Sequence, residues 1–193
     1  MRTARERYVG MMRKLAEKIA AIRSDQRGAS ALEFAIFVGI LAFGLLNTAD
    51  ISIYIYKRMQ VENATEMAVQ AAWKTCDPNQ GQLPATVGSN CPGLTTAITN
   101  AVHSTTLGTQ VSVQTGSPTE AYYCLNSSGA LQNVGAVSSP APADCSVTGN
   151  ASQQPADYIQ ITTTFSYAPL FSGVTIASRF TTPIVRTGMM RLN

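Results

Sequence analysis

An uninterrupted apolar run near the N-terminus constrains the fold of this chain more than any other feature. Residues 34–46 are all apolar or glycine, and after positions 47–50 the apolar pattern resumes through residue 56. An α-helix rises 1.5 Å per residue, so residues 34–56 would extend about 34 Å. The hydrocarbon core of a bilayer is about 30 Å thick. The sequence therefore predicts a helix that spans a membrane over residues 34–56.

Charged side chains are scarce outside the first 28 residues. Only 13% of the chain is charged, whereas soluble domains average roughly 25%. Residues 1–28 nevertheless hold eight of the 14 Lys and Arg but only three of the 11 Asp and Glu. The positive-inside rule places this basic leader in the cytoplasm and residues 76–193 across the membrane, in the periplasm if the cell is bacterial. Because the basic charge is confined to the leader, we expect membrane lipid and no nucleic acid as a partner.

Two other interpretations of the apolar run are a buried core helix and a cleaved secretory signal. A core helix would have to be covered on all sides, and no other segment of this chain can do so. A secretory signal needs small residues at positions −3 and −1 of the cut. The one candidate after the run is Asn47-Thr48-Ala49, which has a bulky polar residue at −3 and would leave Asp50 as the mature N-terminus.

The helix is expected to continue beyond the membrane to residue 75. Residues 57–75 have small apolar side chains at helical spacings of three and four and polar side chains on another side. Pro78 ends the pattern, since proline cannot continue a helix. We predict one helix over residues 29–75, with an amphipathic outer half at 57–75. Its apolar positions are Val61, Ala64, Ala68, Ala71 and Ala72.

The remaining residues, 76–193, indicate a small α+β domain. Alternating apolar and polar residues predict a half-buried strand at 159–167, and the alternation returns at 174–180. Residues 126–155 are rich in Ser, Gly, Ala, Pro and Asn, which predicts a long loop. We expect an antiparallel sheet packed on the outer half of the long helix. The other expected elements are a short helix at 94–104 and strands at 110–114 and 121–125.

All four cysteines lie on the predicted outer side of the membrane. An even number of cysteines outside the cytoplasm predicts two disulfides. Zinc binding is disfavoured because the sequence contains no Cys-x-x-Cys pair. Four cysteines allow three pairings, and we favour the one in which each bond closes a loop that otherwise has little to hold it. That pairing is Cys76 with Cys91 and Cys124 with Cys145.

A glycine followed four residues later by Glu-Phe stands directly ahead of the apolar run. Glu33 is unusual because a carboxylate that enters lipid is costly without a partner. If the chain were cut after Gly28, the new ammonium group of Ala29 would lie one helical turn from Glu33, or within its reach from a neighbouring copy. A helix-start carboxylate stabilised by the macrodipole is an equally good interpretation.

The basic leader, Gly28, the Glu33-Phe34 pair, the long apolar helix and the amphipathic segment 60–72 together resemble TadE-like pseudopilins of the tight-adherence (Flp) pilus system. The resemblance covers about residues 24–75. It implies that a membrane prepilin peptidase cleaves after Gly28 on the cytoplasmic side, which makes Ala29 the first mature residue. General type IV pilins usually have an aromatic residue there, so Ala29 favours the tight-adherence branch.

The resemblance also implies a pilin-like fold, a bacterial inner-membrane location with the C-terminal domain in the periplasm, and incorporation into an extracellular pilus. The main Flp pilin is only the helix, so a C-terminal domain of this size implies a minor subunit that acts in pilus assembly and adhesion. The implied partners are the prepilin peptidase, other pilin or pseudopilin subunits and the inner-membrane Tad assembly platform.

The sequence offers little for catalysis. His103 is the only histidine, so a cluster of histidines cannot hold a metal. Asp144 and Asp157 flank loops without an evident acid or base partner, and no nucleophile-elbow, P-loop or zinc-protease motif occurs. We expect a protein that is not an enzyme and needs no cofactor or metal. The alternative function is an uncleaved, membrane-anchored periplasmic binding or adhesin module, for which the mature N-terminus would be Met1 rather than Ala29.

Overall fold

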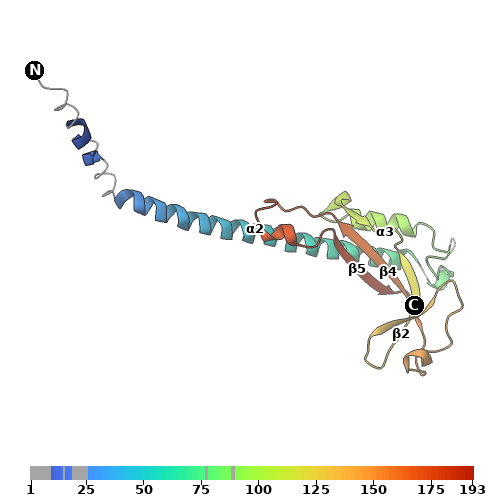
Figure 1. The fold of residues 1–193 in the computed structure, drawn as a ribbon. Coiled ribbons are helices and arrows are strands. Elements are labelled where there is room, and N and C mark those ends of the chain that lie inside the picture. Colours follow the sequence, from blue (N-terminus) through green and yellow to red (C-terminus); the bar gives the residue numbers. More distant parts are fainter. Residues whose placement is uncertain (1–9, 15, 19–25, 77, 88–89) are drawn as a thin grey trace, which may run out of the picture. The chain divides into compact units, whose positions relative to one another are not determined.

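The computed structural model describes residues 10–14, 16–18, 26–76, 78–87 and 90–193 (Figure 1). The other positions, among them much of the predicted leader, lie outside the described residues. The chain divides into two compact units, Met1–Thr48 and Ala49–Asn193. The labelled helices are α2 (Gln26–Thr75) and α3 (Leu94–His103), with short 3-10 helices η1 (Pro78–Gln80), η2 (Gly108–Gln110), η3 (Ser146–Thr148) and η4 (Ile176–Arg179). The strands are β1 (Val111–Val113), β2 (Thr119–Leu125), β3 (Leu131–Ala136), β4 (Ala156–Phe165) and β5 (Ile184–Arg191).

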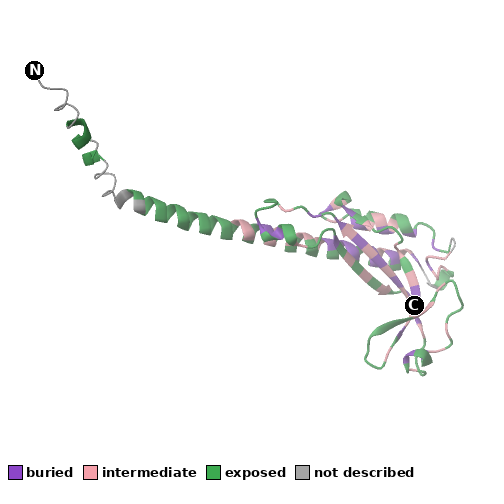
Figure 2. Cartoon of the chain, viewed as in Figure 1, coloured by how far each residue is buried: buried purple, intermediate pink, exposed green. Residues whose placement is uncertain are grey.

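Helix α2 has 50 residues and matches the long helix predicted from the sequence. It is long and apolar enough to cross a membrane. All described side chains over residues 30–45 are exposed, as the green first part of α2 in Figure 2 shows. The polar side chains that follow are bonded to the helix itself: Asn47 donates to the Phe43 carbonyl at 2.8 Å and Thr48 to the Gly44 carbonyl at 2.9 Å. Such internal bonds let polar residues sit in an apolar helix at little cost.

Strand β4 is the centre of a five-stranded antiparallel sheet. One of its edges pairs with β5 along most of its length, while the other pairs with β2 in its first half and with β1 near its end. Strand β3 extends the sheet beyond β2. The burial of β4 alternates strictly from Ile159 to Phe165. The predicted period-2 strand and the α+β fold class are therefore both confirmed.

The buried face of the sheet packs against the second half of α2. The helix buries Val61, Ala64, Ala68 and Ala72, which are four of its five predicted apolar positions. Gly188 of β5 allows an especially close approach, because a Cβ atom added there would lie 3.1 Å from the Cγ2 of Thr65 and 3.3 Å from the Cγ1 of Val69. The hydroxyl of Thr65 also shares a 2.6 Å hydrogen bond with that of Thr163 on β4. Small side chains and one buried polar contact thus fix the sheet on the helix.

Two expectations for the C-terminal half were wrong, and one strand was missed. Residues 126–155 are not one long loop, because they contain strand β3 and the short helix η3. The alternation at residues 174–180 does not form a strand: it ends in η4, and the buried positions there are Thr175 and Ala177 rather than the apolar residues beside them. The last strand, β5, lies further along the chain and was not predicted.

Candidate functional site

The start of α2 presents the residues that the sequence singled out. Gly28, Glu33 and Phe34 are helical and exposed, and the backbone of Ala29 is helical as well. Among the described residues, no atom lies within 4 Å of the Cβ that a side chain at Gly28 would add. A glycine inside a helix costs about 1 kcal/mol relative to alanine. Packing within the described part of the chain therefore gives no reason for glycine at this position.

The Glu33 side chain has neither a hydrogen bond nor an ion pair to any described residue. It stands among exposed apolar side chains, for example Leu32, Phe34 and Phe37, which are 64%, 70% and 75% exposed. The Glu33 carboxylate is thus the polar exception on an apolar surface. If that surface is covered by lipid or by another helix, the carboxylate needs a positive or hydrogen-donating partner from outside the described chain.

Asp50 is a second charged residue in the apolar half of α2, and it is completely buried. Its Oδ1 accepts a hydrogen bond from the Leu170 amide at 3.0 Å, and its Oδ2 accepts from the Phe171 amide at 3.3 Å and the Thr175 hydroxyl at 2.5 Å. A buried carboxylate is tolerated only when its oxygens are bonded in this way. We call this group of four residues the Asp50 anchor, since it ties the loop over residues 168–176 to the helix.

An aromatic cluster lies beside the Asp50 anchor. The ring of Tyr54 on α2 packs edge-on against Tyr167, with 5.0 Å between the ring centres, and also against Phe180 at 4.6 Å. The Tyr167 hydroxyl donates to the Asp50 carbonyl at 3.3 Å. The desolvation of Tyr167 and the nearby Asp50 carboxylate raise the pKa of its phenol. This ring therefore stays neutral and keeps its proton for that hydrogen bond.

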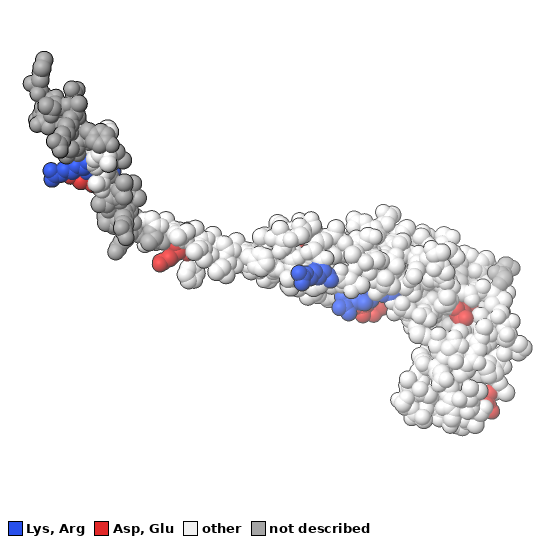
Figure 3. Space-filling view, viewed as in Figure 1, with Lys and Arg blue, Asp and Glu red and all other residues white. Residues whose placement is uncertain are grey.

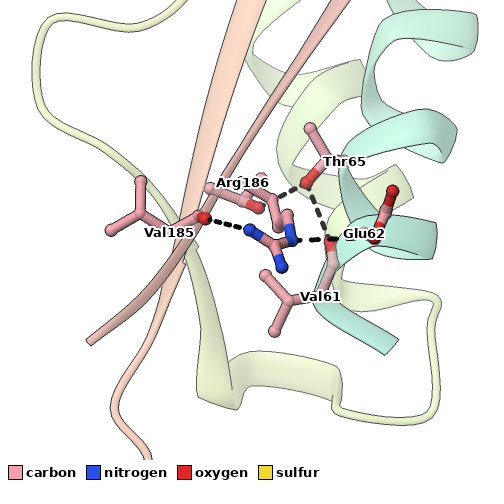
Figure 4. Close-up of polar contacts among 6 residues, drawn as sticks. Val61, Glu62, Thr65, Val185 and Arg186 are labelled. Atoms are coloured by element: carbon pink, nitrogen blue, oxygen red, sulfur yellow. Dashed lines mark hydrogen bonds and ion pairs between the residues drawn. The ribbon is translucent and has the colours of Figure 1, made fainter. Parts of the chain in front are cut away.

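A further polar contact joins β5 to α2 (Figure 4). The Arg186 side chain reaches across to the helix, where its Nε lies 3.6 Å from the Glu62 carboxylate, and its Nη1 donates to the Val185 carbonyl at 3.1 Å. The Glu62 side chain is 59% exposed. An ion pair with one partner so open to solvent adds little stability.

The two disulfides join the same cysteines as the pairing favoured from the sequence. Cys76 is bonded to Cys91 and Cys124 to Cys145, with Cα–Cα distances of 5.5 and 5.7 Å. The first holds the segment after α2 next to the start of α3. The second holds η3 against the end of β2, where Thr148 also donates to the Leu125 carbonyl at 3.1 Å. The first bond closes a segment whose only regular element is η1, whereas the second closes one that contains strand β3.

The sheet also contains a carboxyl pair that the sequence did not reveal. Asp157 does have an acidic neighbour, contrary to expectation: it interacts with Glu120 of β2, while its own Oδ1 is buried without a hydrogen-bond partner among the described residues. Desolvation is the main cause that raises the pKa of Asp157 to about 8, and the interaction with Glu120 raises it further. Both Glu120 oxygens are already used, accepting from the Ala85 amide at 2.8 Å and from the Thr86 amide and hydroxyl at 2.6 Å. Glu120 therefore holds the loop at residues 85–86. One signal for the burial of Asp157 was available in the sequence, because Asp157 is in phase with the inward-facing residues of β4.

Two remaining observations bear on ligands. Within the described residues, no group of three or more His, Cys, Asp or Glu side chains could hold a metal ion. A hollow of about 340 Å³ lies beside the Cys124 disulfide, and its lining includes the edge-stacked rings of Tyr123 and Tyr158 together with Arg191.

Comparison of the chain with family models, with curated proteins and with solved structures finds no match.

Proposed function

We propose that this chain is a non-catalytic, membrane-anchored assembly subunit of a tight-adherence pilus, a TadE-like minor pseudopilin. The observation that carries the proposal is the first half of α2. Its described side chains over residues 30–45 are exposed and, apart from Ser30 and Glu33, apolar or glycine. Exposed apolar surface of this extent marks a site that a membrane or another protein covers. In a pseudopilin, lipid would cover this apolar surface before assembly, and neighbouring helices would cover it afterwards.

The Asp50 anchor limits the length of the membrane span. One face of α2 is covered by the C-terminal domain from Asp50 onward, so lipid cannot surround the helix there. We therefore propose a span over residues 30–49, shorter than residues 34–56. These 20 residues would extend about 30 Å, which matches the hydrocarbon core of a bilayer. Glu33 then lies in the first turn of the span, on the side of the basic leader.

The topology follows from charge and redox chemistry. Eight of the 14 basic residues precede the span, which favours a cytoplasmic N-terminus. Two disulfides in the domain that follows favour an oxidising compartment, which in bacteria is the periplasm. Both arguments support a single-pass protein of the inner membrane with its C-terminal domain outside.

We assign Gly28 to recognition by a prepilin peptidase and Glu33 to assembly. Cleavage after Gly28 would create an ammonium group on Ala29, and this group is the missing partner for the Glu33 carboxylate of a neighbouring pilin subunit. In a dry bundle of helices the attraction between these charges is much stronger than in water. The contact can exist only after cleavage and only between subunits, so Glu33 should act late.

The experiment combines N-terminal sequencing of the membrane-extracted protein with two substitutions. The mature chain should begin at Ala29. Gly28→Phe should block cleavage, whereas Gly39→Phe, at another exposed glycine of α2, should not. Glu33→Gln should leave insertion and cleavage intact but reduce co-purification with partner pilins. Glu66→Gln, an exposed carboxylate in the outer half of the same helix, is the matched control.

Wild-type co-purification of the Glu33→Gln variant, together with normal piliation, would show that Glu33 is only a helix-start residue. A mature N-terminus at Met1 would favour the second candidate function, a tethered binding or adhesin module. The hollow lined by Tyr123, Tyr158 and Arg191 is the observation that favours this alternative, because aromatic rings and an arginine are common in binding sites. An N-terminus at Asp50 would instead indicate a secretory signal.

A further inference from the structure

The loop over residues 168–176 exposes an unusual number of large apolar side chains. Leu170 is 67% exposed, Val174 53%, Ile176 51% and Phe171 37%. The loop is not loose, because Val174 donates its amide to the Phe171 carbonyl at 3.1 Å and Thr175 is buried between the exposed positions. A fixed loop thus presents a compact group of apolar side chains to its surroundings. We call Leu170, Phe171, Val174 and Ile176 the apolar loop patch.

The patch is attached to one defined position on the helix. Leu170 and Phe171 give their amides to Asp50, and Thr175, which lies between Val174 and Ile176, gives its hydroxyl. All four side chains of the patch therefore belong to residues that bind Asp50 or flank one that does. Asp50 follows the end of the apolar run, residue 46, by four residues, or about one helical turn along α2.

Apart from the buried Asp50 carboxylate that binds the loop, the charges in the segments next to the patch are of one sign. Segments 51–61 of the helix and 166–183 of the loop region contain Lys57, Arg58 and Arg179 but no Asp or Glu. Arg58 and Arg179 are exposed. Charged side chains are sparse over the face of the molecule drawn in Figure 3. Apolar side chains flanked by basic ones suit the boundary between acyl chains and phosphate groups.

We propose that the apolar loop patch is a second membrane contact, which inserts into the interfacial layer of the outer leaflet next to the point where α2 leaves the lipid. The proposal rests on the membrane anchoring proposed above. Lipid is favoured over a protein partner because the patch is tied to the helix at Asp50, the first residue beyond the proposed span. The basic side chains beside it match phospholipid phosphates. With two contacts the C-terminal domain would be seated on the bilayer at a fixed level, which presents its sheet to incoming subunits in one orientation.

The test uses the full chain in vesicles of phosphatidylethanolamine and phosphatidylglycerol with brominated acyl chains, which quench tryptophan fluorescence on contact. Trp73 is the only tryptophan, so Trp73→Phe provides a silent background. Leu170→Trp and, separately, Val174→Trp report on the patch. Val147→Trp is the matched control, because Val147 is 75% exposed and lies on η3 at the second disulfide. Phe37→Trp reports on the anchoring of the helix itself.

We expect strong quenching for Phe37→Trp, Leu170→Trp and Val174→Trp, and at least severalfold weaker quenching for Val147→Trp. Quenching of Phe37→Trp without quenching at either patch position would overturn the loop proposal. The membrane anchoring of the helix would then still stand. Protection of the patch positions only when a second protein is added would likewise overturn it in favour of a protein interface. If Phe37→Trp is not quenched, the membrane anchoring fails and the loop proposal fails with it.

Discussion

Replacing Gly188 with alanine tests how the sheet domain is held on α2. The new Cβ would lie 3.1 Å from the Thr65 Cγ2 and 3.3 Å from the Val69 Cγ1, closer than ordinary van der Waals contact. Thr65 cannot rotate away cheaply, because its hydroxyl donates to the Val61 carbonyl at 2.8 Å and shares a buried bond with Thr163. The added methyl must therefore push the strand from the helix or break one of these bonds.

Overpacking of this kind costs about 1–3 kcal/mol. The loss of glycine's extra freedom in the unfolded chain returns about 0.4–1 kcal/mol. We therefore expect Gly188→Ala to lower the free energy of unfolding by about 1–2 kcal/mol. Gly135→Ala is the control, because its new Cβ would meet the nearest atoms of Pro142 and Tyr122 at 3.7–3.9 Å, which is ordinary contact. That variant should be neutral or slightly stabilised.

The assay is urea unfolding of the full chain in detergent, followed by near-ultraviolet circular dichroism with the disulfides intact. The midpoint should fall for Gly188→Ala at an unchanged slope, which would show that stability and not compactness has changed. Adding Thr65→Ser, which removes the Cγ2 methyl but keeps the hydroxyl, should recover part of the loss. A Gly188→Ala variant as stable as Gly135→Ala would refute the close approach of helix and strand.

Three further predictions concern the same domain. The pKa of Asp157 is about 8 in the folded chain and near 3.9 in an unfolded one, so the folded state binds the extra proton between these values. The free energy of unfolding should therefore fall as the pH rises from about 4 to about 8. Asp157→Asn should flatten this dependence in urea titrations carried out at each pH. Mass spectrometry without reductant should find no free thiol, and serine at both Cys76 and Cys91, which close a 15-residue loop, should cost about 3 kcal/mol in the same unfolding assay. Asp50→Ala removes the acceptor for three donors, so chymotrypsin should cut residues 168–176 faster than in the wild type while other sites keep their rates.

Local periodicity explains which elements the sequence revealed. Burial of one face produces both the spacing of small apolar residues in 57–75 and the alternation of β4. Each pattern repeats within a few residues, so a short stretch of sequence is enough to recognise it. Strand β5 breaks that rule at two inward positions. Arg186 places a charged head at the helix, and Gly188 makes room for Thr65. A strand whose inward face carries an arginine and a glycine has no apolar alternation to detect.

Strand β3 escaped detection for a different reason. Its residues are mostly exposed, so no buried face imposes a pattern on them. The strand exists because the turn at residues 126–130 returns the chain alongside β2, where Asn126 accepts hydrogen bonds from the Ser128 and Ala130 amides at 3.0 and 2.9 Å. Composition rich in Ser, Gly and Asn indicates turns correctly, but it does not show that two turns enclose a strand.

The role of Asp50 could not be predicted from the sequence alone. In the sequence it is a flaw in an apolar run, yet in the fold it is the acceptor around which a loop 120 residues further along the chain is organised. No local pattern marks this role, because the donors are two backbone amides and a threonine hydroxyl that any loop could supply. The carboxylate does two things at once under the proposed topology. It prevents lipid from surrounding the helix beyond residue 49, and it holds apolar side chains at that same level, so the position of one charged residue would set both the length of the membrane span and the height of the domain above it.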